Sequence, residues 1–136
     1  MACPYFEPQH VNASPERAMA RLPLIDEYDG LCRAADTPFP VPGPVRFRCC
    51  NHGNSRGTCV HFPAGEVRSS LRYEIVGRTA AALELLLVEE RDYAPHAWQT
   101  IRYFVAGELL EPEIADVVKR AQIRAFCRSF LEHFPA

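Results

Sequence analysis

Three cysteines and two histidines lie within the thirteen residues that run from Cys49 to His61. Imidazoles and thiolates are the ligands that zinc prefers in proteins, and iron–sulfur clusters are held by cysteine thiolates. Two more cysteines, Cys3 and Cys32, lie upstream in sequence that is typical of loops. The residue types therefore predict a metal centre whose ligands come from separate segments of the chain.

The six cysteines differ in their sequence context. Apolar and polar residues alternate from Val45 onward, which predicts a short half-buried strand with Cys49 on its apolar face and Cys50 on the opposite face. Cys127 falls on an apolar face of a predicted helix, where a free cysteine behaves as a small hydrophobic residue. We therefore interpret Cys49 and Cys127 as core thiols. The predicted metal ligands are the other four: Cys3, Cys32, Cys50 and Cys59.

The spacing of these four cysteines, C-x28-C-x17-C-x8-C, bears on the kind of metal. Zinc sites usually contain one pair of ligands about two to four residues apart. The closest predicted pair here, Cys50 and Cys59, is more widely spaced. The pattern therefore favours a four-cysteine iron–sulfur cluster of the 4Fe-4S kind, with a structural, electron-transfer or redox-sensing role. Glycines in the loop would let backbone N–H groups approach the cluster sulfurs.

Two alternatives to a cluster stay open. A structural zinc ion would recruit His52 or His61, because a Cys-x-His spacing on an extended segment puts both side chains on one face. The reserve ligands are therefore Cys49, His52 and His61. In the second alternative no metal binds, and the chain is an interaction module that presents its C-terminal helix to a partner.

Four short motifs carry a resemblance to a known group of proteins. They are Cys3-Pro4-Tyr5-Phe6, Asp29-Gly30-Leu31-Cys32, Cys50-Asn51-x-Gly53 and Cys59-Val60-His61-Phe62-Pro63. With these motifs the first half of the chain resembles an uncharacterised family of small bacterial cysteine-motif proteins. The resemblance implies no established activity, but it implies the same four cysteines as the ligands of an iron–sulfur or zinc centre.

Evidence for an enzyme is weaker. Cys59 paired with His52 or His61, and oriented by Asp36 or Glu66, would be the arrangement of a thiol nucleophile. The sequence contains no phosphate-binding loop, dinucleotide fingerprint, nucleophile elbow or H-E-x-x-H pattern. The sequence therefore leaves catalysis open and favours a binding protein.

The composition is that of an ordinary globular chain. Its 136 residues are enough for a single domain with its own core, and 48% of them are hydrophobic and 24% charged. A net charge of −2 gives no reason to expect nucleic acid or an anionic membrane as a partner. An unidentified protein or a second copy of the chain stays open.

The N-terminal residues lack the basic and apolar regions of a signal peptide, and no apolar run is long enough to span a membrane. We therefore expect a cytoplasmic protein, in which thiols stay reduced. Six cysteines in a reducing compartment indicate metal binding before disulfides.

The elements that must hold these cysteines fall into two parts, 1–44 and 45–136. Residues 1–44 contain eight of the twelve prolines and predict a proline-rich arm, with at most a short helix that begins at Ser14 and stops before Pro23. The arm carries two of the predicted ligands, so a shared metal centre would tie it to the rest of the domain.

Residues 45–136 predict a small antiparallel meander followed by one long helix, an α+β class. Alternating apolar residues predict strands at 71–75 and 101–105, with a loop at 93–96 and a turn at 77–79. Residues 82–91 fit a strand or a helix, and we favour the strand. Pro112 is expected to open the helix, which runs to about residue 133.

The predicted helix has two apolar faces. At 100° per residue, Ile114 and Val118 lie on one face, whereas Ile123 and Phe126 lie on nearly the opposite one. The first face is expected to pack on the sheet. The second is expected to pack on the proline-rich arm or on a second subunit, and we favour the arm.

Overall fold

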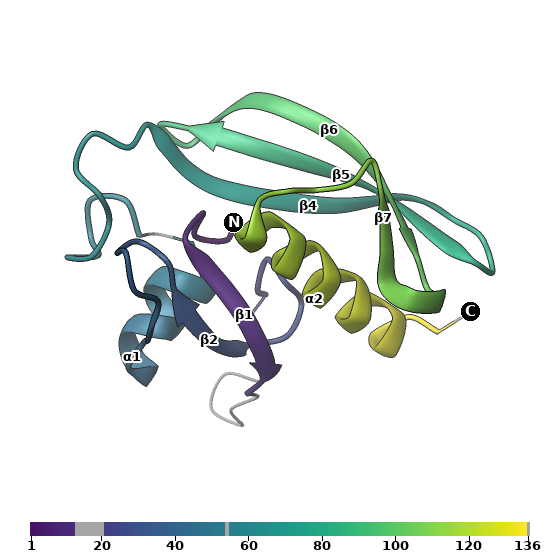
Figure 1. Ribbon diagram of the computed structural model, residues 1–136, viewed down its shortest axis with the longest axis horizontal. Helices are drawn as coiled ribbons and strands as arrows, with labels where there is room; N and C mark the ends of the chain where they lie inside the picture. Colours follow the sequence, from purple (N-terminus) through teal and green to yellow (C-terminus); the bar gives the residue numbers. More distant parts are fainter. Residues whose placement is uncertain (13–20, 54, 136) are drawn as a thin grey trace.

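The computed structural model describes residues 1–12, 21–53 and 55–135 of the chain. These residues form two antiparallel sheets, a few helical turns and one long C-terminal helix, so the predicted α+β class is confirmed (Figure 1). The larger sheet has four strands in the order β4-β5-β6-β7, and the smaller sheet has three in the order β1-β2-β3.

The larger sheet contains the predicted meander. Its strands are β4 (Arg68–Arg78), β5 (Ala82–Arg91), β6 (Ala94–Phe104) and the short β7 (Leu109–Glu111), each antiparallel to the next. Alternate side chains point into the core, since Leu71 and Tyr73 are buried while Arg72 and Glu74, which alternate with them, are exposed. The strand that we favoured at 82–91 is confirmed.

β6 is longer than the strand expected from the sequence, which began at Ile101. Its first seven residues are all exposed, so no apolar alternation marked them as a strand. Hydrogen-bonded pairing with β5 makes them one, and the predicted loop at 93–96 shrinks to a tight turn in which Asp92 and Tyr93 have positive φ angles of 53° and 62°.

The first 44 residues contain a sheet that their proline content concealed. β1 (Phe6–Val11) pairs with β2 (Tyr28–Cys32), and β2 pairs with the two-residue β3 (Phe39–Pro40). β1 and β3 are the edges of this sheet, and proline is tolerated at an edge because no neighbour needs its missing N–H. The short helix expected from Ser14 lies largely outside the described residues.

The strand predicted from Val45 to Cys49 is wrong. The chain instead turns through α1 (Gly43–Val45) into the wide helical turn η2 (Arg46–Asn51), in which the His52 N–H donates to the Phe47 carbonyl at 3.0 Å. An alternation of five residues fits a helical turn as well as a strand, and Pro44 in the first turn favours the helix.

α2 (Val117–His133) is the long C-terminal helix, and it begins five residues after Pro112. The side chain of Asp116 caps it by accepting a hydrogen bond from the Lys119 N–H at 3.0 Å. Pro112 instead follows β7 through a cis peptide bond after Glu111, which corrects the predicted start. Within the described ranges, no helix has the length and apolar character needed to cross a membrane.

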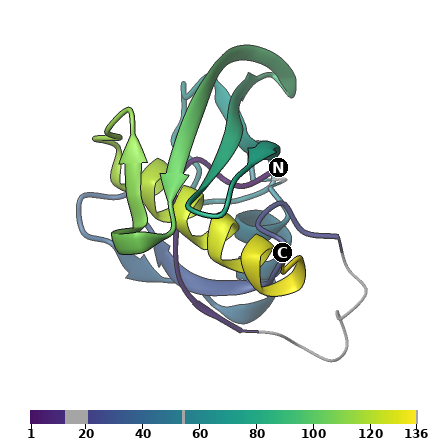
Figure 2. The same ribbon diagram turned by 90° about the vertical axis from the view of Figure 1, so that its right-hand side faces the viewer.

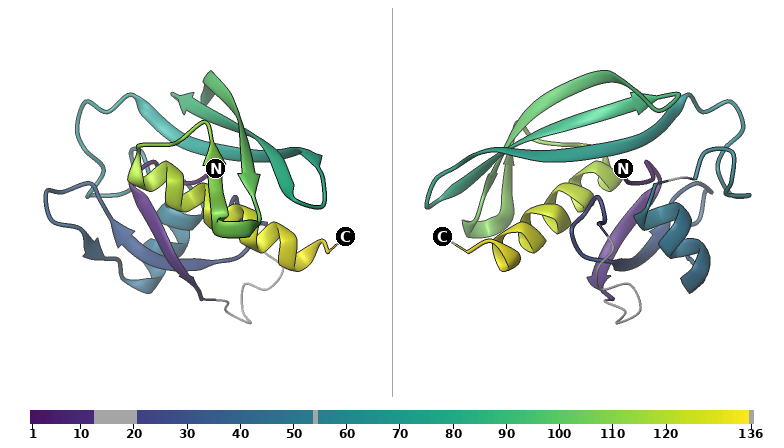
Figure 3. Two further views of the ribbon diagram at one scale, coloured as in Figure 1. Left: turned by 45° about the vertical axis from the view of Figure 1, so that its right-hand side comes forward. Right: turned by 180° about the vertical axis from the view of Figure 1, so that it is seen from behind.

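α2 lies between the two sheets (Figures 2 and 3). On one side the ring of Phe126 lies 5.7 Å from that of Tyr73 in β4. On the other side the Tyr28 hydroxyl of β2 donates to the Ala125 carbonyl at 2.8 Å. The helix thus packs on the first third of the chain as well as on the larger sheet, but the predicted assignment of its faces is wrong, because Phe126 was expected to face the arm and instead packs on β4. Other parts of the chain therefore cover most of the apolar helix face that, in the interaction-module alternative, would be presented to a partner.

Candidate metal centre

One small cavity collects five of the six cysteines. It lies where the smaller sheet meets η2 and the loop that follows, and its thiols are Cys3, Cys32, Cys49, Cys50 and Cys59. Its walls lie close together and leave about 10 Å³ of free space. Four of the five residues are buried, and Cys59 is half-buried. The four predicted ligands thus line the same cavity, and Cys49 lines it with them.

Main-chain hydrogen bonds hold the first two cysteines. Cys3 precedes β1, and its N–H donates to the carbonyl of Cys50 at 3.2 Å. Cys32 is the last residue of β2, where it lies opposite Phe6 of β1 and Phe39 of β3. Ligands 29 positions apart in the sequence are therefore brought together by strand pairing.

Asn51 fixes the position of Cys50 beside it. The Asn51 side chain is buried, and its amide group pairs with the main chain of Tyr28 in β2. Its Oδ1 accepts from the Tyr28 N–H at 2.8 Å, and its Nδ2 donates to the Tyr28 carbonyl at 2.9 Å and to the Arg46 carbonyl at 3.2 Å. One side chain thus ties η2 to β2, the strand that carries Cys32.

A tight turn carries Cys59. The carbonyl of Ser55 accepts from the Thr58 N–H at 3.2 Å and from the Cys59 N–H at 2.8 Å. Upstream of this turn, Gly53 has a φ of +84°, and a Cβ built on it would lie 1.2 Å from the Met1 carbonyl oxygen. Only glycine fits this approach of the loop to the N-terminus.

Burial raises the pKa of four of the five thiols and so favours their protonated form in the metal-free chain. It raises the pKa of Cys3 to about 11, and it raises the pKa of Cys32, Cys49 and Cys50 as well. The neighbouring thiols add to this rise at Cys50, because each disfavours a second negative charge close by. A bound metal cation would displace these protons, so binding would release protons to the solvent.

Two of the sulfurs already accept hydrogen bonds from backbone amides. The Tyr5 N–H donates to Cys3 Sγ at 3.5 Å, and the Ala34 N–H does the same for Cys32, where it opposes the effect of burial on the pKa. In each case the donor lies two residues after the cysteine. Such N–H···S contacts stabilise the thiolate form, the form that binds metals.

The reserve ligands divide between two surfaces. Cys49 and His61 line the cysteine cavity, and the His61 ring packs edge-on against Phe39 at 4.9 Å between centroids. His52 instead packs against Phe47 and lines a separate hollow. The interpretation of Cys49 as a core thiol facing away from Cys50 rested on the strand that the structure replaces with a helical turn. In that turn both cysteines are buried and line the cavity.

Cys127 lies apart from this cavity, fully buried on α2 as the sequence predicted. Burial, followed by the nearby charge of Glu108, raises the pKa of its thiol to about 12. It is a core residue.

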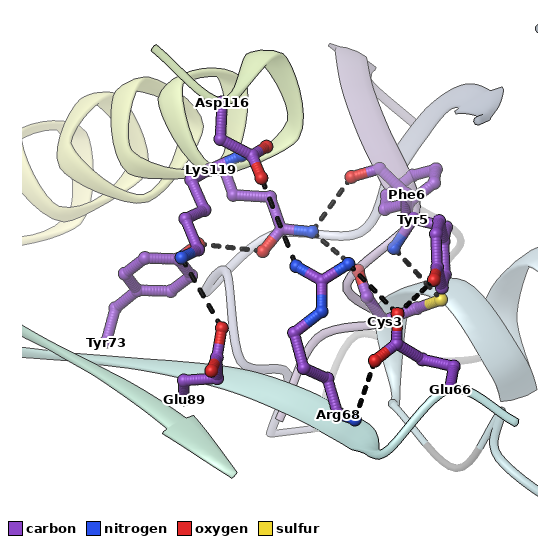
Figure 4. Close-up of polar contacts among 10 residues, drawn as sticks. Cys3, Tyr5, Phe6, Glu66, Arg68, Tyr73, Glu89, Asp116 and Lys119 are labelled. Carbon is purple, nitrogen blue, oxygen red and sulfur yellow. Dashed lines mark hydrogen bonds and ion pairs between the residues drawn. The ribbon is translucent and has the colours of Figure 1, made fainter. Parts of the chain in front are cut away.

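A network of charged side chains runs from beside the cavity to the start of α2 (Figure 4). The Tyr5 hydroxyl donates to Glu66, and Arg68 donates to the same carboxylate at 3.3 Å. Arg68 also lies 4.0 Å from Asp116, the N-cap of α2. Burial alone would raise the pKa of Glu66, but the hydrogen bonds from Tyr5 and Arg68 outweigh it and lower the pKa to about 2. Glu66 is therefore a charged structural group.

This network bears on the thiol-enzyme hypothesis. A Cys–His pair needs a carboxylate to orient the histidine, and the two candidates were Asp36 and Glu66. Glu66 is engaged by Tyr5 and Arg68, and Asp36 is exposed. Because the Glu66 carboxylate is held by Tyr5 and Arg68, it does not orient His52 or His61.

The cysteines line one cavity without forming a ready-made site for a single ion. Among the described residues, no three His, Cys, Asp or Glu side chains converge as they would around one metal ion. Tetrahedral zinc with Zn–S bonds of about 2.3 Å holds its thiolates within about 3.8 Å of one another. A cluster places its thiolates on different iron atoms and so accepts wider separations between the sulfurs.

Ser55 is a member of the site that the sequence analysis missed. Its hydroxyl lines the same cavity as the thiols, and its residue is only 1% exposed. In a loop rich in glycine and asparagine, serine is typical of a turn, so no sequence signal distinguished it.

Comparison with family models, curated proteins and solved structures found no match to this chain.

Proposed function

We propose that this protein binds a metal centre through Cys3, Cys32, Cys50 and Cys59, and that the centre is an iron–sulfur cluster. The observation that carries the proposal is the shared cavity, in which thiols from four separate segments meet. Thiols scattered over 57 positions have no packing reason to share one cavity, because single cysteines are readily buried one at a time, as Cys127 is.

The number and kind of the donors support a cluster over a single zinc ion. Among the residues described, no set of three metal-binding side chains converges as it would around one ion. The donor set agrees, because the buried lining offers sulfur and carries no Asp or Glu. Soft thiolates in apolar surroundings suit iron–sulfur clusters.

The chain's own residues would do three things for such a centre. The aromatic walls, Tyr5, Phe6 and Phe62, exclude water from it. The backbone amides of Tyr5 and Ala34 donate to ligand sulfurs. The cluster itself supplies one-electron chemistry when bound. Its role is then electron transfer or redox sensing in the cytoplasm, or the structural task of holding the smaller sheet, η2 and the loop together.

A zinc ion is the second candidate, and one observation favours it. His61 lines the cavity two residues after Cys59, so a nitrogen ligand is at hand. A small closing movement of the cysteines and His61 around one ion would complete a four-ligand site.

Alanine variants of single cysteines test the proposal. Cys3→Ala, Cys32→Ala, Cys50→Ala and Cys59→Ala should each lose bound metal, measured by elemental analysis of protein purified without oxygen. Cys127→Ala is the matched control, since it removes a buried thiol outside the cavity, and it should keep the metal of the native chain. Metal retained in all four variants, or lost equally in Cys127→Ala, would contradict the ligand set.

A further inference from the structure

The hydroxyl of Ser55 is a buried polar group without a partner in the part of the chain that the structure describes. Leaving such a group unpaired costs about as much as losing a hydrogen bond, and native proteins keep few of them. The hydroxyl lines the cavity of the five cysteines, which carries no other oxygen-bearing side chain except that of Tyr5. An unpaired donor in a cavity of thiols points to a ligand that accepts hydrogen bonds through sulfur.

The backbone of Ser55 is held firmly in place. Its carbonyl accepts from the N–H groups of Thr58 and Cys59 at 3.2 Å and 2.8 Å, so the residue belongs to the turn that carries one of the proposed ligands. The side chain lies beside Cys3, in the same cavity. Ser55 therefore lies beside Cys3 and on the turn that carries Cys59, so it shares the cavity with two proposed ligands.

We propose that Ser55 donates a hydrogen bond from its hydroxyl to a sulfur of the metal centre at Cys3, and that this bond raises the reduction potential of the centre. The inference rests on the proposed function. Reduction adds negative charge that spreads onto the sulfurs, and a donor beside a sulfur stabilises that charge. Ser55 is thus a positioning and tuning residue, and the four cysteines remain the ligands.

The test measures the midpoint potential of the centre by anaerobic redox titration, followed through its visible absorbance. Ser55→Ala removes the donor and should lower the ratio of reduced to oxidised centre about tenfold at a fixed potential, a shift of about 59 mV for one electron. Ser55→Thr keeps a hydroxyl and should stay near the native potential. The matched control is Ser129→Ala, a buried serine on α2 whose partner Tyr28 keeps its bond to the Ala125 carbonyl.

The outcomes separate this inference from the proposed function. Native protein without a redox-active centre overturns both. A native centre whose potential is the same in Ser55→Ala overturns the role of Ser55 alone. If Ser55→Ala fails to hold the centre, the inference requires that Ser55→Thr holds it at the native potential, and loss of the centre in both variants contradicts a role for the hydroxyl. A downward shift in Ser55→Ala with none in Ser129→Ala supports it.

Discussion

The side-chain amide of Gln122 donates to the main-chain carbonyl of Cys3 at 2.8 Å and so joins two residues 119 positions apart. The same nitrogen donates to the Phe6 carbonyl at 2.8 Å, and the side-chain oxygen accepts from the Tyr73 hydroxyl at 2.8 Å. Gln122 is fully buried on α2. One glutamine therefore connects the long helix, the larger sheet and the segment that carries the first proposed ligand.

Gln122→Leu should lower the free energy of unfolding by about 2–4 kcal/mol, because it leaves several buried polar groups short of a partner. Urea denaturation of the metal-free protein measures the change. Gln99→Leu is the matched control, since Gln99 is exposed on β6, and it should change stability by less than about 0.5 kcal/mol. Similar losses in both variants would mean that the buried amide bonds contribute little.

Asn51→Ala should destabilise the fold by about 1–3 kcal/mol, because the N–H and carbonyl of Tyr28 lose the side chain that pairs with them. It should also reduce metal loading, since Asn51 holds the turn that carries Cys50. Unfolding in urea and metal content are the two measurements. Asn12→Ala, at an exposed position, should leave both unchanged. An Asn51→Ala protein with native stability would remove this residue from the account.

Gly53→Ala and Gly57→Ala make a matched pair, because both glycines have a φ of +84°. A Cβ at Gly57 meets no atom within 4 Å, so this change should cost only the backbone strain of about 1–2 kcal/mol. A Cβ at Gly53 would lie 1.2 Å from the Met1 carbonyl oxygen, so Gly53→Ala should cost clearly more and displace the segment before Cys3. Urea midpoints compare the two, and equal midpoints would show that the loop does not approach the N-terminus.

Cys127 predicts a dependence of stability on alkaline pH. Its folded-state pKa of about 12 lies above the ordinary value of 9.0, so the stability contributed by the neutral thiol is present below pH 9 and is lost as the pH rises toward 12. Cys127→Ala should cost about 1 kcal/mol near neutral pH. The difference between the native chain and this variant should then shrink above pH 9 in urea titrations. A constant difference would place the thiol in water rather than in the core.

The larger sheet could be predicted because its strands have one buried face. Leu83, Leu85 and Leu87 are buried while Glu84 and Leu86 between them are half-buried, and the short turn before this segment favoured a strand over a helix. The grouping of cysteines was also visible, since ligand chemistry depends on residue type. The sequence alone could not show which thiols face the cavity, because the strand parity that separated Cys49 from Cys50 belonged to a strand that does not form.

Other features could not be predicted from the sequence for physical reasons. Pro8 and Pro40 look like strand breakers until their strands are known to lie at sheet edges. Gln122 looks like a solvent-facing residue of a helix, because its burial depends on carbonyls more than a hundred residues away. In the sequence Ser55 looks like an ordinary turn serine, because only the fold shows that its turn lies against Cys3.

The most direct test of the central claim is the iron and sulfide content of the full chain purified without oxygen. We expect a coloured protein that contains iron and sulfide in equal amounts, about four of each per chain, as a 4Fe-4S cluster requires. A colourless protein with one zinc ion would contradict the cluster and leave the zinc site. A colourless protein that binds neither metal after reconstitution and unfolds normally would contradict the metal centre itself.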